Sequence, residues 1–132
     1  MDDIELKGCL QMIAIEEFTA RYVGLWNEPD AAARAAVVAQ LWSEDARMCT
    51  GANEYVGLDA ITQRVTTAYE KFVLGQGCLF RQLGATDAHH DGVRIRWEMV
   101  PASGGDAVSG GTQFLLLDRD RRVRSDHQFI DF

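Results

Sequence analysis

Apolar residues in the first half of the chain recur every three or four positions, which is the spacing of one helical face. A first helix is predicted from about Leu10 to Trp26, and its apolar face consists of Ala14, Phe18, Tyr22 and Leu25. A second helix is predicted to follow almost at once and to end near Leu41 and Trp42. Its expected N-cap is Asn27, because Pro29 and Asp30 both suit a first helical turn.

A third helix is predicted from Leu58 to about Val73, ending near Gly75 and Gly77. The segment before it should form a short strand at residues 47–50, followed by a loop or a second short strand to Tyr55. Both predictions rest on local pattern alone.

The second half of the chain has the composition of strands separated by turns. The expected strands are "CLFRQLGATDAH", "GVRIRWEMV", "AVSGGTQFLLLD" and "RVRSDHQFIDF". The Asp91-Gly92 pair predicts a tight hairpin between the first two, and residues 118–122 can form the last turn. Helices followed by strands favour an α+β fold, in which three N-terminal helices pack on a strongly curved antiparallel sheet in a single domain of residues 1–132.

Composition and charge narrow the class of function. The chain has 132 residues, of which 47% are hydrophobic and 25% charged, as is usual for a globular protein that folds alone. Its formal net charge of −7 disfavours nucleic acid as a partner. The acidic start and the lack of a stretch of roughly 18 apolar residues argue against a secretory signal and a membrane span. We therefore expect a cytoplasmic protein that does not bind membranes.

Neither the cysteines nor the glycines form a cofactor motif. Cys9, Cys49 and Cys78 are far apart, and we expect them to be small buried residues in a reducing compartment. The Gly104-Gly105 and Gly110-Gly111 pairs lack the strand-to-helix context of phosphate-binding loops. No cofactor is expected.

The segment "DAHHDGVRIRWEMVP" contains two adjacent histidines, His89 and His90. Neighbouring residues of a strand point to opposite faces, so a shared metal ion is disfavoured. The favoured interpretation is a solvated hairpin tip, and contact of one histidine with a pocket or a partner subunit is the second. No metal site is predicted.

The strand that follows has an apolar row, with Trp97 in it, and a charged row that includes Arg96 and Glu98. If the apolar row faces the interior, Trp97 forms a binding wall. If the strand is inverted, Arg96 and Glu98 are buried polar groups that need a purpose. The first orientation is favoured because burying charge without a ligand is costly.

Several strings together resemble the nuclear transport factor 2-like superfamily and, within it, the SnoaL-like group of polyketide-cyclase relatives. They are "YVGLWNEPDAAARAAVVAQLWSEDARM", "YVGLDAI", "DAHHDGVRIRWEMVP", "SGGTQFLLLDRDRRV" and "HQFIDF", and they cover most of residues 14–132. The resemblance implies a cone-shaped, barrel-like fold with an apolar cavity, and a homodimer formed through the outer face of the sheet. It also implies a range of activities, among them cyclases, isomerases, dehydratases and epoxide hydrolases, beside members with no known activity.

The catalytic positions of the family match only in part. The acid–base Asp of the cyclases falls on Gln113 or Phe114. Arg96-Trp97-Glu98 is similar to the Arg-x-Asp of the epoxide hydrolases, but the Asp that these enzymes carry on the last strand falls near Gln128. Tyr22 matches the helix-one tyrosine of the steroid isomerases.

Two hypotheses follow. In the first, the protein binds a small apolar or aromatic molecule and carries out acid–base chemistry of isomerase, cyclase or hydrolase type, with His127 as the catalytic proton carrier because it titrates near neutrality. Packing is the competing role for His127 and for most of the aromatic residues. The predicted ligand-binding residues are Tyr22, Trp26, Trp42, Tyr55, Tyr69, Phe80, Trp97, Gln113 and Phe129. In the second hypothesis, the protein is a non-catalytic ligand-binding or dimeric interaction module.

Overall fold

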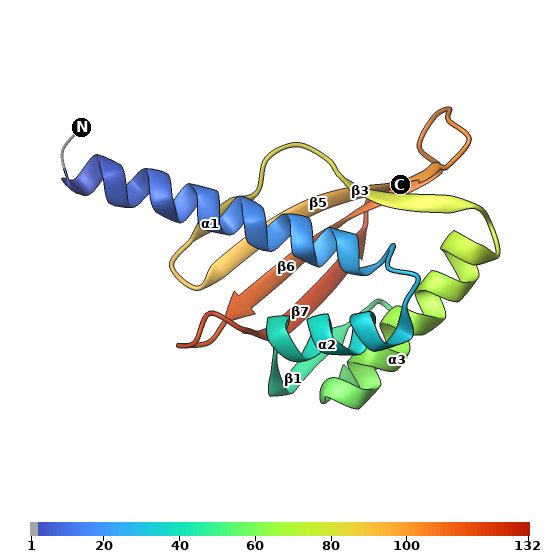
Figure 1. Cartoon of the computed structure of the whole chain (residues 1–132), viewed down its shortest axis with the longest axis horizontal. Coiled ribbons are helices and arrows are strands. Elements are labelled where there is room, and N and C mark those ends of the chain that lie inside the picture. Colours follow the sequence, from blue (N-terminus) through green and yellow to red (C-terminus); the bar gives the residue numbers. More distant parts are fainter. Residues whose placement is uncertain (1–2) are drawn as a thin grey trace.

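The computed structural model describes the backbone of residues 3–132 and the side chains of residues 14–132. Its helices are α1 (Asp3–Leu25), α2 (Ala31–Leu41) and α3 (Leu58–Ala68), and α3 continues into a π-helical segment, η1 (Tyr69–Leu74). In Figure 1, α1 crosses in front of β5 and β6, whereas α2 and α3 lie lower, close to β1. Among the residues that are described, no helix is both long enough and apolar enough to cross a bilayer.

Seven strands form one strongly curved sheet. They are β1 (Trp42–Cys49), β2 (Glu54–Val56), β3 (Cys78–Gln82), β4 (Asp87–His89), β5 (Gly92–Pro101), β6 (Ser109–Leu117) and β7 (Val123–Ile130). The strand order is β2-β1-β7-β6-β5-β3, with β4 paired to β5. The α+β class with helices packed on a curved sheet is confirmed, but β1 runs parallel to β7, so the sheet is mixed rather than antiparallel. A parallel pair is possible here because a long crossover containing α3 separates the two strands.

Local differences from the sequence predictions have simple causes. The N-cap of α2 is Asp30, whose side chain accepts a hydrogen bond of 3.0 Å from the backbone of Ala33. Asn27 instead binds both backbone groups of Phe80, donating at 2.7 Å and accepting at 2.8 Å, and so ties the α1–α2 turn to β3. The hairpin turn is centred on His90 and Asp91, with His90 at φ 53°, rather than on Asp91 and Gly92.

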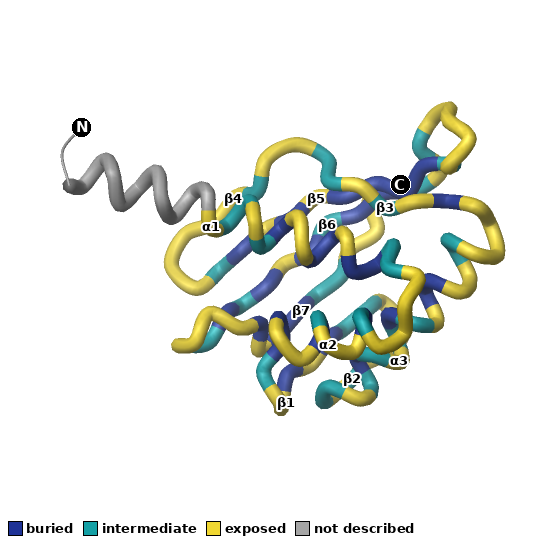
Figure 2. The backbone as a smooth tube through the Cα atoms, viewed as in Figure 1, coloured by how far each residue is buried: buried dark blue, intermediate teal, exposed yellow. Residues whose placement is uncertain are grey.

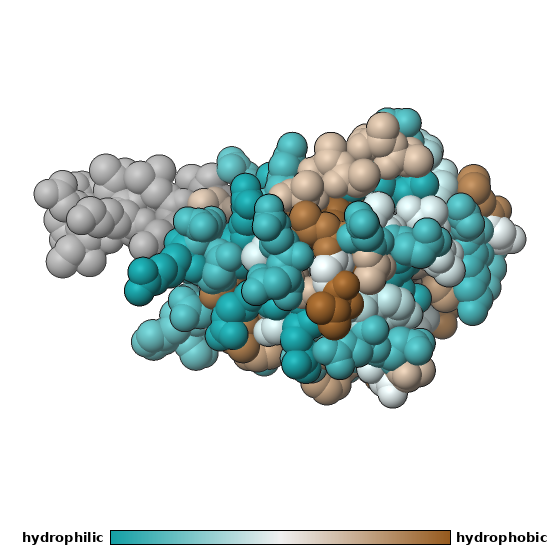
Figure 3. Space-filling view, turned by 90° about the horizontal axis from the view of Figure 1, so that it is seen from below, coloured by the Kyte–Doolittle hydropathy of each residue, from teal (hydrophilic) through white to brown (hydrophobic). Residues whose placement is uncertain are grey.

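The apolar row of β5 faces the helices. Val93, Ile95, Trp97 and Met99 are buried, whereas Arg94 and Arg96 of the other row are exposed. Buried positions follow β5 and β6 along most of their length and the first half of β7 (Figure 2). Seen from the side on which α2 and α3 lie, the surface is mostly hydrophilic, with hydrophobic residues in small separate groups (Figure 3). The sheet and the helices therefore enclose the apolar interior between them.

The predicted burial of the cysteines is met in part. Cys78 is buried and Cys49 is half-buried, and both are free thiols. The side chain of Cys9 lies outside the described residues.

A close backbone approach in β6 holds the Trp97 ring in place. A Cβ atom on Gly111 would lie 2.7 Å from that ring and 2.5 Å from the carbonyl oxygen of Phe129. Since overpacking typically costs about 1–3 kcal/mol, we expect Gly111→Ala to lower the free energy of unfolding by that amount in urea denaturation. Gly24→Ala is the control, because the α1 site has no atom within 4 Å of the added methyl group. It should raise the stability by about 1 kcal/mol, and a Gly111→Ala protein as stable as this control would contradict the close approach.

Candidate functional site

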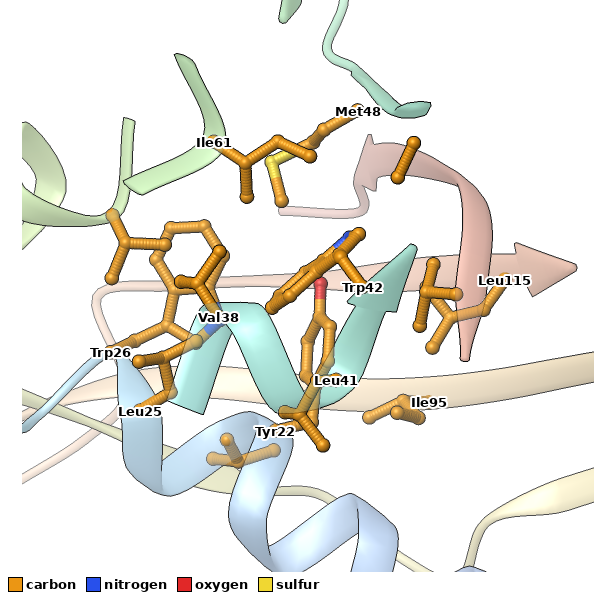
Figure 4. Packing of buried hydrophobic residues seen from close by; sticks show 14 of the residues in the cluster. Tyr22, Leu25, Trp26, Val38, Leu41, Trp42, Met48, Ile61, Ile95 and Leu115 are labelled. Carbon is orange, nitrogen blue, oxygen red and sulfur yellow. The ribbon is translucent and has the colours of Figure 1, made fainter. Parts of the chain in front are cut away.

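Tyr22 extends from α1 into the centre of the molecule. Its ring centroid lies 5.4 Å from that of Trp42 and 6.3 Å from that of Trp26, and the residue is 2% exposed. Figure 4 shows Tyr22 reaching from α1 toward Trp42, near Leu41 and Ile95. Aromatic packing therefore fixes the position of the phenol hydroxyl.

This hydroxyl belongs to a buried hydrogen-bond network that joins α1 to three strands. Tyr22 Oη donates to Asp126 Oδ2 at 2.5 Å, and Gln113 Nε2 donates to Asp126 Oδ1 at 2.7 Å. Gln113 Nε2 also lies 3.1 Å from Tyr22 Oη. Trp97 Nε1 donates to Gln113 Oε1 at 3.0 Å, which fixes the orientation of the amide. Every polar atom of the Asp126 carboxylate and of the Gln113 amide therefore has a partner.

Burial changes the acidity of both ionisable groups in the network. Asp126 has no exposed surface, and the loss of hydration raises its pKa from 3.8 to about 7. The hydrogen bonds from Tyr22 and Gln113 lower this pKa but do not offset the burial. Burial likewise raises the pKa of Tyr22 well above its ordinary value, and the neighbouring Asp126 carboxylate raises it further. Asp126 is therefore poised to gain or lose a proton near neutral pH.

The network meets a pocket of about 130 Å³ whose surface is mostly apolar. The residues that line it are Tyr22, Val23, Trp26, Arg64, Ala68, Phe72, Phe80, Trp97, Met99, Ser109, Gln113, Gln128 and Ile130. Asp126 does not line the pocket itself but is hydrogen bonded to Tyr22 and Gln113, which do.

Five predicted ligand-binding residues, Tyr22, Trp26, Phe80, Trp97 and Gln113, line this pocket. Phe80 is at the centre of the aromatic group, with ring centroids 5.6 Å from Trp97 and 6.4 Å from Trp26. Both contacts are edge-to-face. The role of these residues as ligand contacts stays a prediction.

The other four predicted ligand-binding residues lie elsewhere. Trp42 is completely buried in the core, and Tyr69 packs under the guanidinium of Arg34 at 4.8 Å. Tyr55 lies on β2, outside the pocket lining. Phe129 is 56% exposed on the outer face of the sheet. Aromatic character alone therefore did not distinguish residues of the pocket wall from residues of the core or of the surface.

His127 also lies outside the pocket, and the reason is a register shift. Leu117 pairs with Val123 but Leu116 pairs with Ser125, so β7 has one extra residue at this point. Such a bulge moves every later side chain to the opposite face. His127, opposite Phe114, therefore points outward, and Asp126, opposite Leu115, points inward. His127 therefore does not line the pocket, and its role as a proton carrier stays a prediction.

Sequence reasoning missed Asp126 and Arg64. The one available signal for Asp126 was the resemblance to the epoxide hydrolases, which placed a last-strand Asp near Gln128, two residues along the same face. Nothing in the sequence pattern singled out Arg64, because a single arginine on a helix is usually exposed to solvent. The histidine pair is exposed at the hairpin tip, and no metal-binding group of three or more His, Cys, Asp or Glu is found in the described part of the chain.

Three solved structures illustrate the similarity of this fold to known proteins. A SnoaL-like protein from Agrobacterium tumefaciens, to which an isomerase activity has been ascribed, is 28% identical, with a TM-score of 0.80 over 93% of this chain and 99% of the other. A protein of unknown function from Exiguobacterium, described as nuclear transport factor 2-like, is 21% identical, with a TM-score of 0.66 over 86% and 98%. A Sinorhizobium meliloti protein ascribed to the polyketide cyclases is 15% identical, with a TM-score of 0.65 over 86% and 94%.

The 28% identical structure is similar to this chain over nearly its whole length, which supports the resemblance to SnoaL-like proteins, and the structures that are 21% and 15% identical share its fold. No protein-family model and no curated protein matches the sequence.

The raised pKa of Asp126 predicts a specific pH dependence of stability. Between pH 3.8 and about 7 the folded state holds a proton on Asp126 that the unfolded state has lost, so the free energy of unfolding falls as the pH rises through this range. Asp126→Asn does not titrate and should become more stable relative to the wild type as the pH rises, then level off above pH 7. Urea denaturation at a series of pH values measures the difference.

Asp106→Asn is the matched control, since Asp106 is an exposed carboxylate. Its stability difference from the wild type should stay nearly constant across the same pH range. Parallel curves for Asp126→Asn and the wild type would contradict the protonation of Asp126 in the folded protein.

Proposed function

We propose that this protein binds a small, largely apolar or aromatic molecule in the pocket and transfers protons to it through Tyr22 and Asp126. One observation carries the proposal: a tyrosine that lines an aromatic pocket is hydrogen bonded through its hydroxyl to a buried carboxylate whose pKa is about 7. Groups with strongly perturbed pKa values beside a cleft are characteristic of catalytic sites.

The protonation state of Asp126 decides what Tyr22 offers a ligand. When Asp126 is ionised, Tyr22 donates its proton to the carboxylate and has only lone pairs for the pocket. When Asp126 is neutral, its own proton is donated to Tyr22 Oη, and the tyrosine proton is free for a ligand oxygen. A neutral carboxylic acid in an apolar site supports carbonyl and enolate chemistry in this way.

The proposed reaction is therefore acid catalysis on a carbonyl or enol, which is chemistry of the isomerase type. The isomerase activity ascribed to the 28% identical Agrobacterium protein supports this choice. The outward position of His127 argues against it as the proton carrier.

Acetophenone in D₂O is a direct probe: Tyr22 donates a hydrogen bond to the carbonyl oxygen, solvent water removes a methyl proton to give the enol, and the enol carbon takes up deuterium as it returns to the ketone. We expect the wild type to accelerate this exchange, followed by NMR, and Tyr22→Phe to lose roughly 100-fold of the acceleration, as when an oxyanion-stabilising donor is removed. His127→Gln should keep the wild-type rate. Loss of exchange in His127→Gln but not in Tyr22→Phe would contradict the assignment.

Binding of the same ketone should depend on pH. In the wild type it should weaken as the pH rises through about 7, because Tyr22 then donates to the ionised carboxylate. Asp126→Asn should abolish the dependence, since its amide donates to Tyr22 at every pH. Binding with this pH profile but without exchange would support the alternative of a non-catalytic binding module.

We also propose that two copies of the chain associate through the outer face of the sheet. Phe114 and Phe129 are 43% and 56% exposed on this face, on the paired strands β6 and β7. Two of the flanking arginines are paired within the chain, Arg94 with Asp87 at 2.7 Å and Arg47 with Glu54 at 3.8 Å. An apolar centre with a polar rim is typical of a protein interface.

This association predicts a dimer in light scattering coupled to size exclusion. Phe114→Asp should shift the protein toward the monomer, because the new carboxylate would be buried in the interface. Leu74→Asp, at an exposed residue of η1, should leave the dimer intact. A monomeric wild type across a concentration series would overturn the proposal.

A further inference from the structure

Arg64 is the one charged residue among those that line the pocket. It lies on α3, one turn before Ala68, which also lines the pocket. The other walls are mainly aromatic and aliphatic, with the polar groups of Ser109, Gln113 and Gln128. Arg64 is half-buried, and a cation beside a small apolar pocket requires a physical reason, since removing charge from water is costly.

Within residues 14–132 the structure provides neither a carboxylate nor a hydrogen-bond acceptor for this cation. Its Nε atom is buried without a hydrogen-bond partner, and none of the ion pairs found in residues 14–132 includes Arg64. Arg34 shows the contrast, because its Nε donates to Thr66 Oγ1 at 3.3 Å and another guanidinium nitrogen donates to the carbonyl of Glu28 at 2.7 Å. The Arg34 guanidinium thus has hydrogen-bond acceptors that give it a structural role, whereas the Nε donor of Arg64 has no acceptor.

Arg64 does not act as the counter-charge of Asp126. Both oxygens of that carboxylate accept hydrogen bonds from Tyr22 and Gln113. The influences on the pKa of Asp126 are burial and these two bonds, whereas the positive charge of Arg64 acts on Tyr22, whose pKa it lowers. Arg64 therefore lies close enough to influence the tyrosine end of the network while it stays unpaired.

The Arg64 side chain has a defined place. Its guanidinium carbon lies 5.7 Å from the centre of the Tyr55 ring, a cation–π distance, so β2 supports the charge from outside the pocket. Tyr55, one of the predicted ligand-binding residues, thus contacts a pocket residue without lining the pocket itself.

We propose that the ligand carries a carboxylate, which pairs with Arg64, on an apolar body about the size of one aromatic ring. A cavity of about 150 Å³ holds a benzene molecule, and this pocket has about 130 Å³. The ring would lie among Trp26, Phe80 and Trp97, with its reactive oxygen toward Tyr22. A single guanidinium matches one carboxylate, whereas a phosphate dianion would need further donors. This inference rests on the proposed function and names its substrate class.

The test compares phenylacetate with phenylacetamide, which have nearly the same shape but differ in charge at pH 8. Isothermal titration of the full chain should show that the wild type binds the carboxylate roughly 10- to 100-fold more tightly, as expected for a charge-assisted hydrogen bond. Arg64→Gln should remove this preference while still binding the amide, and Arg64→Lys should retain part of it. Arg96→Gln is the matched control, because Arg96 is an exposed arginine of β5 and its loss changes the net charge equally.

Each outcome decides between the two proposals. A carboxylate preference that Arg64→Gln abolishes and Arg96→Gln keeps supports the inference. Equal binding of both probes, or a preference that survives in Arg64→Gln, overturns the carboxylate and leaves the ligand pocket standing. Binding of either probe that is unchanged in Ala68→Leu, whose larger side chain fills the pocket, overturns the ligand pocket as well. Binding of acetophenone but of neither probe by the wild type overturns the carboxylate alone. Circular dichroism of each variant separates loss of binding from loss of fold.

Discussion

The buried carboxylate of Asp126 is the group on which the interior of this protein depends. An ionised carboxylate without exposed surface is strongly disfavoured unless hydrogen bonds satisfy it, and here Tyr22 from α1 and Gln113 from β6 donate to its two oxygens. The same bonds therefore hold the first helix at a defined place over the sheet. Because the hydrogen bonds do not offset the burial, the carboxylate keeps a pKa of about 7. The side chain that connects the helix to the sheet can therefore also gain and lose a proton near neutral pH.

The network also determines the character of the pocket wall. Trp97 donates its indole proton to Gln113, so the polar edge of this residue is satisfied and the rest of its ring forms part of the apolar wall. Tyr22 likewise turns its hydroxyl toward Asp126 and its ring toward Trp42 and Trp26. After these groups are paired, Arg64 is the residue of the lining that carries both a charge and an unused donor. The pocket thus combines a tyrosine that is hydrogen bonded to a buried carboxylate, an aromatic wall and one cation, which is the arrangement that the proposed aromatic acid would match.

Periodicity predicted the architecture well because it reports burial, and burial follows directly from the order of apolar and polar residues. The helical spacing of Phe18, Tyr22 and Leu25 correctly indicated the buried face of α1, and the alternation in β5 correctly favoured Trp97 on the inner face. Tyr22 and Trp97, both placed by periodicity, lie in the pocket lining for the same reason. The boundary between α3 and η1 was not predicted, since both helical forms present nearly the same apolar stripe over a few residues.

The sequence by itself determined the class of fold, the inward row of the central strand and the aromatic character of the interior, because these depend on local pattern and on the hydrophobic effect. Only the tertiary structure decided the chemistry of the site. One extra residue in β7 exchanges the faces of Asp126 and His127, and that bulge exists only in the pairing with β6. The parallel alignment of β1 with β7 and the unpaired state of Arg64 likewise depend on which segments meet in space. A carboxylate acquires a pKa near 7 through the surroundings that folding gives it, and no local spacing of residues encodes those surroundings.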